Sequence, residues 1–216
     1  MDCAHLLTGL IDSGVIAIVR LSSSDKLLSV AEALVEGGVR YVEFTMTTPR
    51  ALDVLAQATE SLGDPVVLGA GTVLDPESAR AAILAGARFI VTPTLNPEVI
   101  SVARRYGVLV VPGALTPTEI LNAWQLGADL VKVFPVDTLG PGYIKALRGP
   151  LPQVGLVPTG GVGVANAADY VRAGAAALGV GSSLVNDRVV AEEDWPGLTA
   201  AARRLIEVVA GAKGGA

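Results

Sequence analysis

The sequence contains few of the side chains on which disulfide-stabilised folds, zinc sites and histidine-dependent hydrolases rely. Its 216 residues include one cysteine, Cys3, and one histidine, His5, both close to the N-terminus. Zinc sites are built mainly from several cysteine and histidine ligands. A histidine-based catalytic dyad is disfavoured, because His5 falls in the first expected helix, where a surface or packing role is expected. These absences exclude a disulfide framework and a histidine-rich zinc site.

Charge of one sign is nowhere concentrated, and long apolar runs are missing. The formal net charge is −5, and the 16 lysine and arginine residues are spread along the chain. Proteins that bind a phosphate backbone carry a basic patch, so we expect no nucleic-acid partner. Glycine, proline or a charged residue interrupts each apolar run before it could span a bilayer, and no signal peptide is recognisable. We expect a cytoplasmic protein with no membrane partner.

Hydrophobic residues and glycine are abundant, at 51% of the chain and 25 residues respectively. This composition can bury a large core, and we expect a single domain over residues 1–216. Short β-branched runs alternate with alanine- and leucine-rich segments of helical period. The expected strands are Val15–Arg20, Val39–Met46, Val66–Thr72, Arg88–Thr92, Val108–Pro112, Asp129–Phe134, Val154–Thr159 and Ala176–Gly181. The expected helix cores are Glu32–Glu36, Ala51–Glu60, Pro76–Ala85, Pro97–Arg105, Pro117–Leu126, Gly142–Leu147, Ala165–Ala173 and Leu198–Ala210.

Eight strands, each followed by a helix, favour a (β/α)8 TIM barrel, in which parallel strands are covered on both faces. The alternative is a doubly wound open sheet. In such a sheet the first strand is followed by a glycine-rich dinucleotide-binding turn, whereas this chain reads Arg20-Leu21-Ser22-Ser23-Ser24. We therefore expect a barrel whose reactive groups collect at the C-terminal ends of the strands.

Lys132 lies in an otherwise apolar strand segment, Asp129–Pro135, where a charge is costly to bury. A buried ammonium either finds a partner or loses its proton, and a neutral amine is a nucleophile toward carbonyl groups. Schiff-base chemistry is one interpretation. An ion pair between the lysine and a carboxylate at a strand end is the other, and the lysine alone does not decide between them.

Glu43 is the carboxylate that the strand pattern places nearest to this lysine. Side chains alternate along a strand, so Glu43 faces the opposite way from Val42 and Phe44 and points into the barrel. The same alternation sends Lys132 inward. Glu43 is therefore either an ion-pair partner for the lysine or an acid/base group that acts with it.

Glycine and hydroxyl residues gather at the ends of the expected strands. They occur in Gly69–Thr72, Thr92–Thr94, Pro158–Gly161 and Gly181-Ser182. Any one of these segments could be a tight turn and no more. Together they fit a ligand site, because small residues let a ligand approach the backbone. The segments after the seventh and eighth strands lie where barrels commonly hold phosphate, which indicates a phosphorylated substrate.

Four segments, in order and at matching strand positions, resemble the 2-keto-3-deoxy-6-phosphogluconate (KDPG) aldolases, which also cleave 4-hydroxy-2-oxoglutarate (KHG). The segments are Gly69-Ala70-Gly71-Thr72-Val73, Val131-Lys132-Val133-Phe134-Pro135, Pro158-Thr159-Gly160-Gly161 and Gly181-Ser182. The resemblance spans residues 15 to about 185 and implies a class I aldolase. Such an enzyme needs neither metal nor cofactor, releases pyruvate, and forms a homotrimer.

The resemblance also implies a role for each matching residue. Lys132 corresponds to the Schiff-base lysine and Glu43 to the general acid/base. The implied substrate contacts are Arg20, Thr47, Thr72, Pro93, Phe134 and Thr159, and the implied phosphate contacts are Gly160, Gly161, Gly181 and Ser182. Thr47 is a departure, because many members have a substrate-binding arginine there, and the next arginine in this chain is Arg50. The substrate preference is therefore open.

Two other functions fit the same phosphate loops. A phosphosugar isomerase or epimerase would need opposed acid/base groups or a metal, and few carboxylates are expected inside this barrel. A non-catalytic sugar-phosphate-binding barrel would have no use for an inward lysine opposite an inward glutamate. Trapping of an imine separates an aldolase from both.

Overall fold

The computed structural model describes residues 2–63 and 66–214. The helices in these ranges are α1 (Cys3–Ser13), α2 (Leu27–Glu36), α3 (Ala51–Leu62), α4 (Pro76–Leu84), α5 (Pro97–Arg105), α6 (Pro117–Gln125), α7 (Gly140–Arg148), α8 (Ala167–Arg172), α9 (Asp187–Glu192) and α10 (Trp195–Gly214). The strands are β1 (Val15–Val19), β2 (Tyr41–Thr45), β3 (Val67–Gly71), β4 (Phe89–Val91), β5 (Leu109–Val111), β6 (Gly113–Ala114), β7 (Val131–Val133), β8 (Leu156–Pro158) and β9 (Leu178–Val180).

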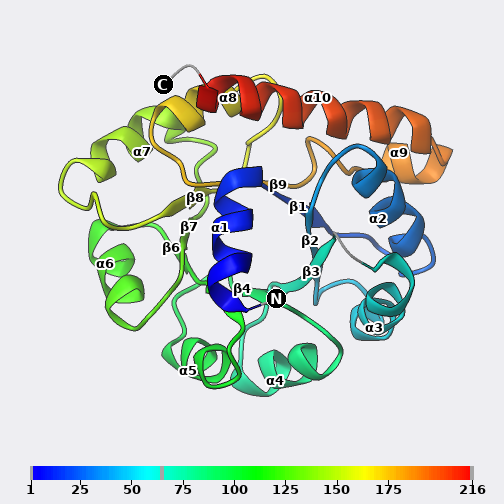
Figure 1. Cartoon of the computed structure of the whole chain (residues 1–216), viewed down its shortest axis with the longest axis horizontal. Coiled ribbons are helices and arrows are strands. Elements are labelled where there is room, and N and C mark those ends of the chain that lie inside the picture. The colour runs from blue at the N-terminus through cyan, green and yellow to red at the C-terminus, as the bar shows by residue number, and fades with distance from the viewer. Residues whose placement is uncertain (1, 64–65, 215–216) are drawn as a thin grey trace.

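The strands run parallel and curl, with helices around their outer side (Figure 1). One ladder has the order β5-β4-β3-β2-β1-β9 and the other has the order β6-β7-β8. Pro112 alone separates β5 from β6, and its carbonyl accepts a hydrogen bond from Lys132 N at 2.9 Å. At the other side, Thr159 after β8 forms a parallel bridge with Gly179 of β9. The fold is thus an α/β fold with a curled parallel sheet.

All eight expected strands are present, each shortened at one or both ends, and every expected helix has a counterpart. Helix α1 corresponds to the first expected helix, the one that contains His5, and two further elements, β6 and α9, were not predicted. The ladder is interrupted before β6 because Pro112 has no N–H to donate. Helix α9 is six residues long and buries none of them, so it lacks the apolar stripe by which a helix is recognised in a sequence.

Several helix starts follow directly from local sequence. Asp75, Asn96 and Thr116 cap α4, α5 and α6 by accepting backbone N–H groups of the first turn. A proline follows each cap, at a position where a missing N–H costs nothing. These caps fix where each loop from a strand end enters its helix, and therefore shape the loops that surround the strand ends.

Two apolar cores lie on opposite faces of the sheet. Val42, Phe44, Val131 and Val133 belong to the core between strands and outer helices. Tyr41 belongs to the core inside the curl, which is the face that Glu43 shares by alternation. The facing predicted for β2 and β7 is therefore confirmed.

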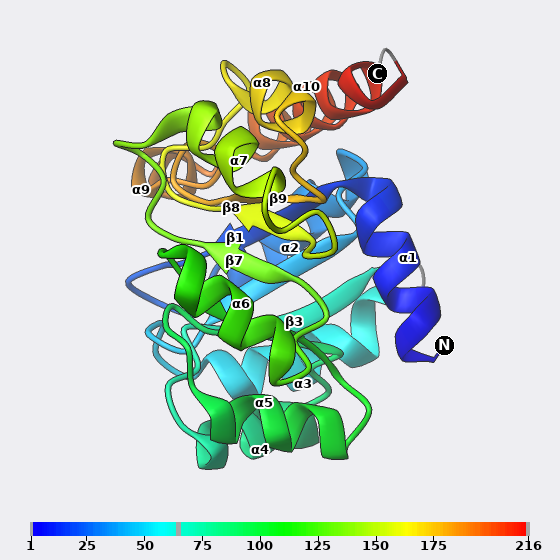
Figure 2. The ribbon, with the colours of Figure 1, turned by 90° about the vertical axis from the view of Figure 1, so that its left-hand side faces the viewer.

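Helix α1 covers the N-terminal end of the strands, opposite to α9 (Figure 2). Leu6 and Leu10 of α1 pack into the inner core, and the Tyr41 hydroxyl donates a 2.7 Å hydrogen bond to Leu6 O. This end of the sheet is closed, so a ligand reaches the inner face from the C-terminal strand ends.

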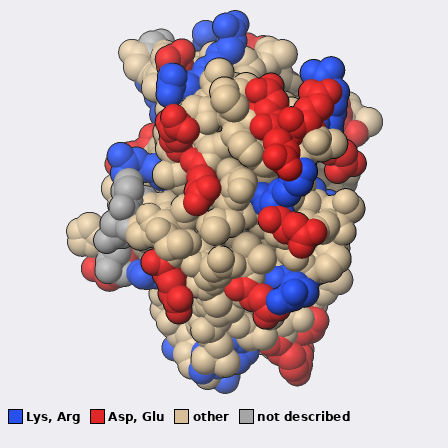
Figure 3. Space-filling view, turned by 90° about the vertical axis from the view of Figure 1, so that its right-hand side faces the viewer, with Lys and Arg blue, Asp and Glu red and all other residues tan. Residues whose placement is uncertain are grey.

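On the face that carries α2 and α3, acidic and basic side chains are interspersed (Figure 3). None of the helices within the described ranges combines the length and hydrophobicity needed to cross a membrane.

Candidate active site

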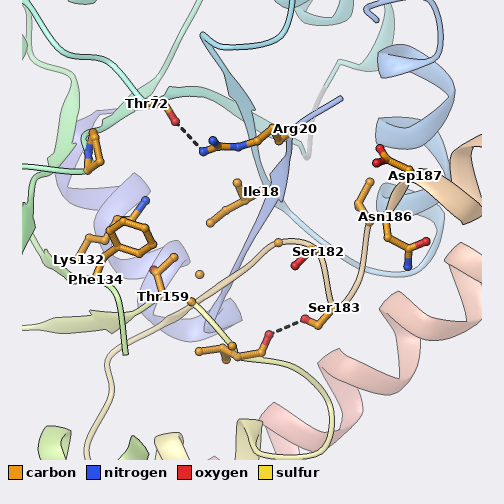
Figure 4. Close-up of a pocket in the computed structure, with 17 residues that line it drawn as sticks. Ile18, Arg20, Thr72, Lys132, Phe134, Thr159, Ser182, Ser183, Asn186 and Asp187 are labelled. Carbon is orange, nitrogen blue, oxygen red and sulfur yellow. Dashed lines mark hydrogen bonds between the residues drawn. The ribbon is translucent and has the colours of Figure 1, made fainter. Parts of the chain in front are cut away.

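A cavity of about 550 Å³ opens at the C-terminal ends of the strands (Figure 4). It receives side chains or backbone from the ends of β1, β3, β4, β7, β8 and β9 and from the loops that follow. Its lining residues are Ile18, Arg20, Thr72, Pro93, Lys132, Phe134, Thr159, Gly160, Gly161, Val162, Gly179, Gly181, Ser182, Ser183, Val185, Asn186 and Asp187. The cavity therefore brings together all the expected site residues except Glu43 and Thr47.

Lys132 extends from the middle of β7 into this cavity and is only 5% exposed. Its Nζ lies 5.0 Å from the centroid of the Phe134 ring. Within residues 2–63 and 66–214, no carboxylate oxygen comes within 4.0 Å of Nζ to form an ion pair. The simple ion pair considered from the sequence is therefore not formed.

Burial lowers the pKa of Lys132, because removing the ammonium from water disfavours its charged form. Glu43 opposes this change and Arg20 reinforces it. A lysine with a lowered pKa has a larger fraction of neutral amine near neutral pH. Lys132 thus has the environment of a nucleophile, with a cavity beside it that can hold a carbonyl compound.

Glu43 lies on β2 and is 1% exposed, on the inner face of the sheet but outside the cavity lining. Neither of its carboxylate oxygens has a hydrogen-bond partner among the described residues. Burial raises its pKa, while the charges of Lys132 and Arg20 act in the opposite direction. Burial thus drives the two groups toward neutrality from opposite sides: the amine toward its unprotonated form and the carboxyl toward its protonated form.

The glutamate is accommodated by a glycine on the neighbouring strand. Gly71 is the register partner of Thr45, two residues beyond Glu43 on β2. A Cβ at Gly71 would overlap Oε1 and Cδ of Glu43 and would lie 2.5 Å from its Cγ. The carboxyl group therefore occupies space that any other residue at position 71 would fill.

Arg20 and Thr72 form one edge of the cavity, as Figure 4 shows. The guanidinium donates a 3.1 Å hydrogen bond to Thr72 Oγ1. Thr72 has a φ of 58°, a left-handed conformation that is unfavourable for a β-branched residue. Such a conformation costs about 1–3 kcal/mol and is concentrated at functional sites. The strained threonine is thus held where its hydroxyl contacts the one arginine that lines the cavity.

Pro93 lies close to β6, the strand that pairs with β7 at Lys132. Gly113 of β6 is the register partner of Lys132, and a Cβ on Gly113 would collide with the Pro93 backbone. Thr92 Oγ1 accepts from Gly113 N at 3.1 Å and donates to Thr94 O at 2.5 Å. This network fixes Pro93 beside Lys132.

The other end of the cavity is lined by the loops after β8 and β9. Gly160 and Gly161 have φ values of 96° and 69°, which are readily adopted by glycine. Gly181 and Ser182 lie on the second loop. The expected phosphate residues thus lie on two loops that line the same cavity, and Gly160 borders the segment after β7, because a Cβ there would lie 3.6 Å from the Phe134 ring.

Thr47 lies outside the cavity, although it was expected to bind substrate. The chain turns after β2, where Thr48 N donates to Thr45 O at 2.9 Å, and this turn leaves Thr47 exposed with its hydroxyl 3.1 Å from that of Thr45. Arg50 does not replace the family arginine here: its Nε donates to Asp53 Oδ2 at 3.0 Å on the surface. Among the lining residues, Arg20 is therefore the only arginine.

Seven lining residues were missed by sequence reasoning: Ile18, Val162, Gly179, Ser183, Val185, Asn186 and Asp187. Asn186 caps α9 by accepting hydrogen bonds from Arg188 N and Val189 N, each at 3.1 Å. An asparagine shortly after the eighth strand was a usable signal for a helix start. The remaining residues gave no signal, because their proximity arises only from the curl of the sheet.

No cluster of three or more histidine, cysteine, aspartate or glutamate side chains within the described part of the chain is arranged to hold a metal ion.

Comparison with known proteins identifies the family. The family model for KDPG and KHG aldolase matches residues 8–201. A 2-dehydro-3-deoxy-phosphogluconate aldolase of Treponema pallidum is 37% identical over 196 residues, covering 90% of this chain and 93% of that protein. A 2-dehydro-3-deoxy-6-phosphogalactonate aldolase of Escherichia coli is 39% identical over 170 residues, covering 78% and 83%.

A solved structure agrees with the sequence relatives. KDPG aldolase from Legionella pneumophila, with pyruvate captured as a covalent carbinolamine, superposes with a TM-score of 0.80 at 27% identity, covering 94% of this chain and 97% of that one. The resemblance seen in the sequence is confirmed, and the chain belongs to the family of KDPG and KHG aldolases.

Proposed function

We propose that the protein is a class I aldolase that cleaves KDPG to pyruvate and glyceraldehyde 3-phosphate, and also KHG to pyruvate and glyoxylate. The observation that carries the proposal is Lys132, a lysine with a lowered pKa, no ion pair in the described chain, and a cavity at its Nζ. Metal-independent carbonyl chemistry at this position needs a neutral amine.

The reaction begins when the neutral Lys132 amine attacks the C2 ketone and forms a carbinolamine, which loses water to give a protonated imine. As the C3–C4 bond breaks, the C4 hydroxyl loses its proton and becomes the aldehyde, and the imine takes up the electron pair as an enamine. A proton then returns to C3, and water hydrolyses the imine to release pyruvate and the free amine.

We assign the proton transfers to Glu43. Since its carboxyl group is buried behind the cavity lining, the proton passes through one water molecule between Glu43 and the substrate. The raised pKa of Glu43 supports this role, because an acid/base group must both accept and donate a proton near the working pH.

The proposed substrate orientation follows the two ends of the cavity. The pyruvyl end contacts Thr72, Pro93, Phe134 and Thr159, with Arg20 as a further substrate contact. The phosphate contacts Gly160, Gly161, Gly181 and Ser182. Thr47 has no part in this arrangement because it lies outside the cavity.

We also propose that β5 and β6 count as one strand, which makes the fold an eight-stranded barrel and a single domain over residues 1–216. The short gap at Pro112 and the bridge between Thr159 and Gly179 support this interpretation. A homotrimer, the assembly implied by the family resemblance, is our proposal for the quaternary structure.

The substrate assignment is tested by comparing three substrates. We expect kcat/KM for KDPG to exceed that for unphosphorylated 2-keto-3-deoxygluconate by at least about tenfold, because the phosphate adds binding energy remote from the reacting bond. KHG should be cleaved, and a chelator should leave all three rates unchanged. Equal kcat/KM values for KDPG and 2-keto-3-deoxygluconate would contradict the assignment of the phosphate contacts. Loss of activity in the presence of a chelator would contradict the class I mechanism.

The pH at which imine formation slows is expected to shift in opposite directions in Glu43→Gln and Arg20→Gln. The rate of pyruvate imine formation, measured by borohydride trapping, should fall as the pH falls through the lowered pKa of Lys132, because the amine becomes protonated. Glu43→Gln removes a charge that raises this pKa, so the fall should occur at lower pH. Arg20→Gln removes a charge that lowers it, so the fall should occur at higher pH. Identical profiles in both variants would contradict this electrostatic account.

A further inference from the structure

The loops that follow β8 and β9 are joined by a serine that the proposed chemistry does not use. Ser183 Oγ donates a 2.5 Å hydrogen bond to the carbonyl of Val162, as the dashed line in Figure 4 shows. Val162 follows Gly160 and Gly161, and Ser183 follows Gly181 and Ser182. The bond therefore links the two segments to which we assign the substrate phosphate.

Each loop is held internally by its own hydrogen bonds. In the first loop, Asn166 Nδ2 donates to Gly161 O, and Gly163 N donates to Asn166 Oδ1, both at 2.9 Å. In the second, Leu184 N and Val185 N both donate to Gly181 O at 2.9 Å. These hydrogen bonds hold the shape of each loop. The bond from Ser183 to Val162 is formed between the loops and therefore influences the distance between them.

The first loop leaves room for this serine. A Cβ at Gly163 would lie 2.9 Å from both Cβ and Oγ of Ser183, closer than side chains normally pack. Since Gly163 has no side chain, Ser183 can approach the loop and its hydroxyl can reach the Val162 carbonyl.

We propose that Ser183 is a positioning residue that sets the distance between the two loops and so determines the affinity for the phosphate of the substrate. An anion bound by groups from two segments is held well only when both segments are already at the correct spacing. Lys132 is flanked in register by Gly113 of β6 and Val157 of β8, and the Ser183 bond lies outside both strands, because Val162 comes four residues after the end of β8. Its effect should therefore be confined to phosphorylated ligands. This inference rests on the proposed function for the identity of the ligand.

The test is Ser183→Ala, assayed with KDPG and with unphosphorylated 2-keto-3-deoxygluconate. We expect KM for KDPG to rise about tenfold, which corresponds to about 1.4 kcal/mol. The kcat for KDPG should change by less than about twofold, and both constants for the unphosphorylated substrate should stay at the wild-type values. Ser183→Thr keeps the hydroxyl and should restore the low KM for KDPG.

The matched control is Ser61→Ala on α3. Ser61 Oγ also donates to a backbone carbonyl, that of Gln57, at 2.9 Å, but far from the cavity. This variant should behave as the wild type with both substrates. Equal losses for the two substrates in Ser183→Ala, or an unchanged KM for KDPG, would overturn the inference.

Binding of inorganic phosphate, measured by calorimetry, separates the inference from the proposed function. Weaker phosphate binding by Ser183→Ala than by the wild type and by Ser61→Ala would support the role of Ser183 even if neither keto acid were cleaved. Equal binding by the three proteins would overturn it, whatever the cleavage assays show. Absence of cleavage by the wild type would count against the proposed function alone.

Discussion

Replacing Lys132 with alanine is expected to abolish cleavage of KDPG, with a loss in kcat of at least about 10⁴-fold, as is usual when a covalent nucleophile is removed. The variant lacks the amine that forms the imine, and a water molecule in its place cannot act as an electron sink for the C3–C4 bond pair. Pyruvate release under saturating substrate is the measurement.

The matched control for this variant is Lys145→Ala, which removes an exposed lysine of α7. It should keep the wild-type rate. Circular dichroism should establish that both variants are folded, since Lys132 is buried and its truncation leaves a space in the inner core. A Lys132→Ala enzyme that is folded and retains a tenth of the activity would exclude the covalent mechanism.

The second large effect is expected from Gly71→Ala, although Gly71 carries no functional group. The added methyl group would overlap the Glu43 carboxyl, which must then move away from its position behind the cavity. A displaced acid/base group typically reduces turnover by about 10²- to 10³-fold. Imine formation with pyruvate should persist, because Lys132 is unaffected. The measurements are kcat and borohydride trapping on the same preparation.

Two comparisons separate this positional effect from a loss of folding. Gly142→Ala in α7 adds a methyl group that meets nothing within 4 Å, and it should leave kcat unchanged. In a Glu43→Ala background, Gly71→Ala should cost no further stability, because the clash has been removed. If Gly71→Ala alone kept its turnover within about twofold of the wild type, the position of the Glu43 carboxyl would not matter for the reaction.

Side-chain alternation along single strands was enough to predict which residues face the inside of the sheet. Glu43 and Lys132 both lie there, buried, as the pattern of their apolar neighbours indicated. Strand ends rich in glycine and threonine were also a reliable signal, since Thr72, Gly160 and Gly181 line the same cavity. Such patterns are local, and a parallel sheet places their ends at one edge.

The parts of the site that were missed depend on tertiary geometry. The turn after β2 carries Thr47 away from the cavity, and its direction is set by packing that a single strand does not encode. Asp187 reaches the cavity on α9, a helix without an apolar stripe. The bond from Ser183 to Val162 joins residues 21 positions apart. None of these has a periodic signal in the sequence.

The buried pair also explains why the sequence alone left two interpretations of Lys132. An ion pair and a nucleophile both require an inward lysine opposite an inward glutamate. The structure separates them by burial and distance: neither oxygen of Glu43 has a hydrogen-bond partner in the described chain, and Lys132 has no ion pair there. A buried amine without an ion-pair partner is costly when charged and nucleophilic when neutral, and a buried carboxyl group with a raised pKa can both accept and donate a proton.

The central claim is that the Lys132 amine forms the imine. Incubation with pyruvate and borohydride, followed by proteolysis and mass spectrometry of the peptides, tests it most directly. The account predicts a stable mass increase on the peptide that contains Lys132 and none on those that contain Lys26, Lys145 or Lys213. Labelling of another lysine, or no labelling of an active enzyme, would contradict it.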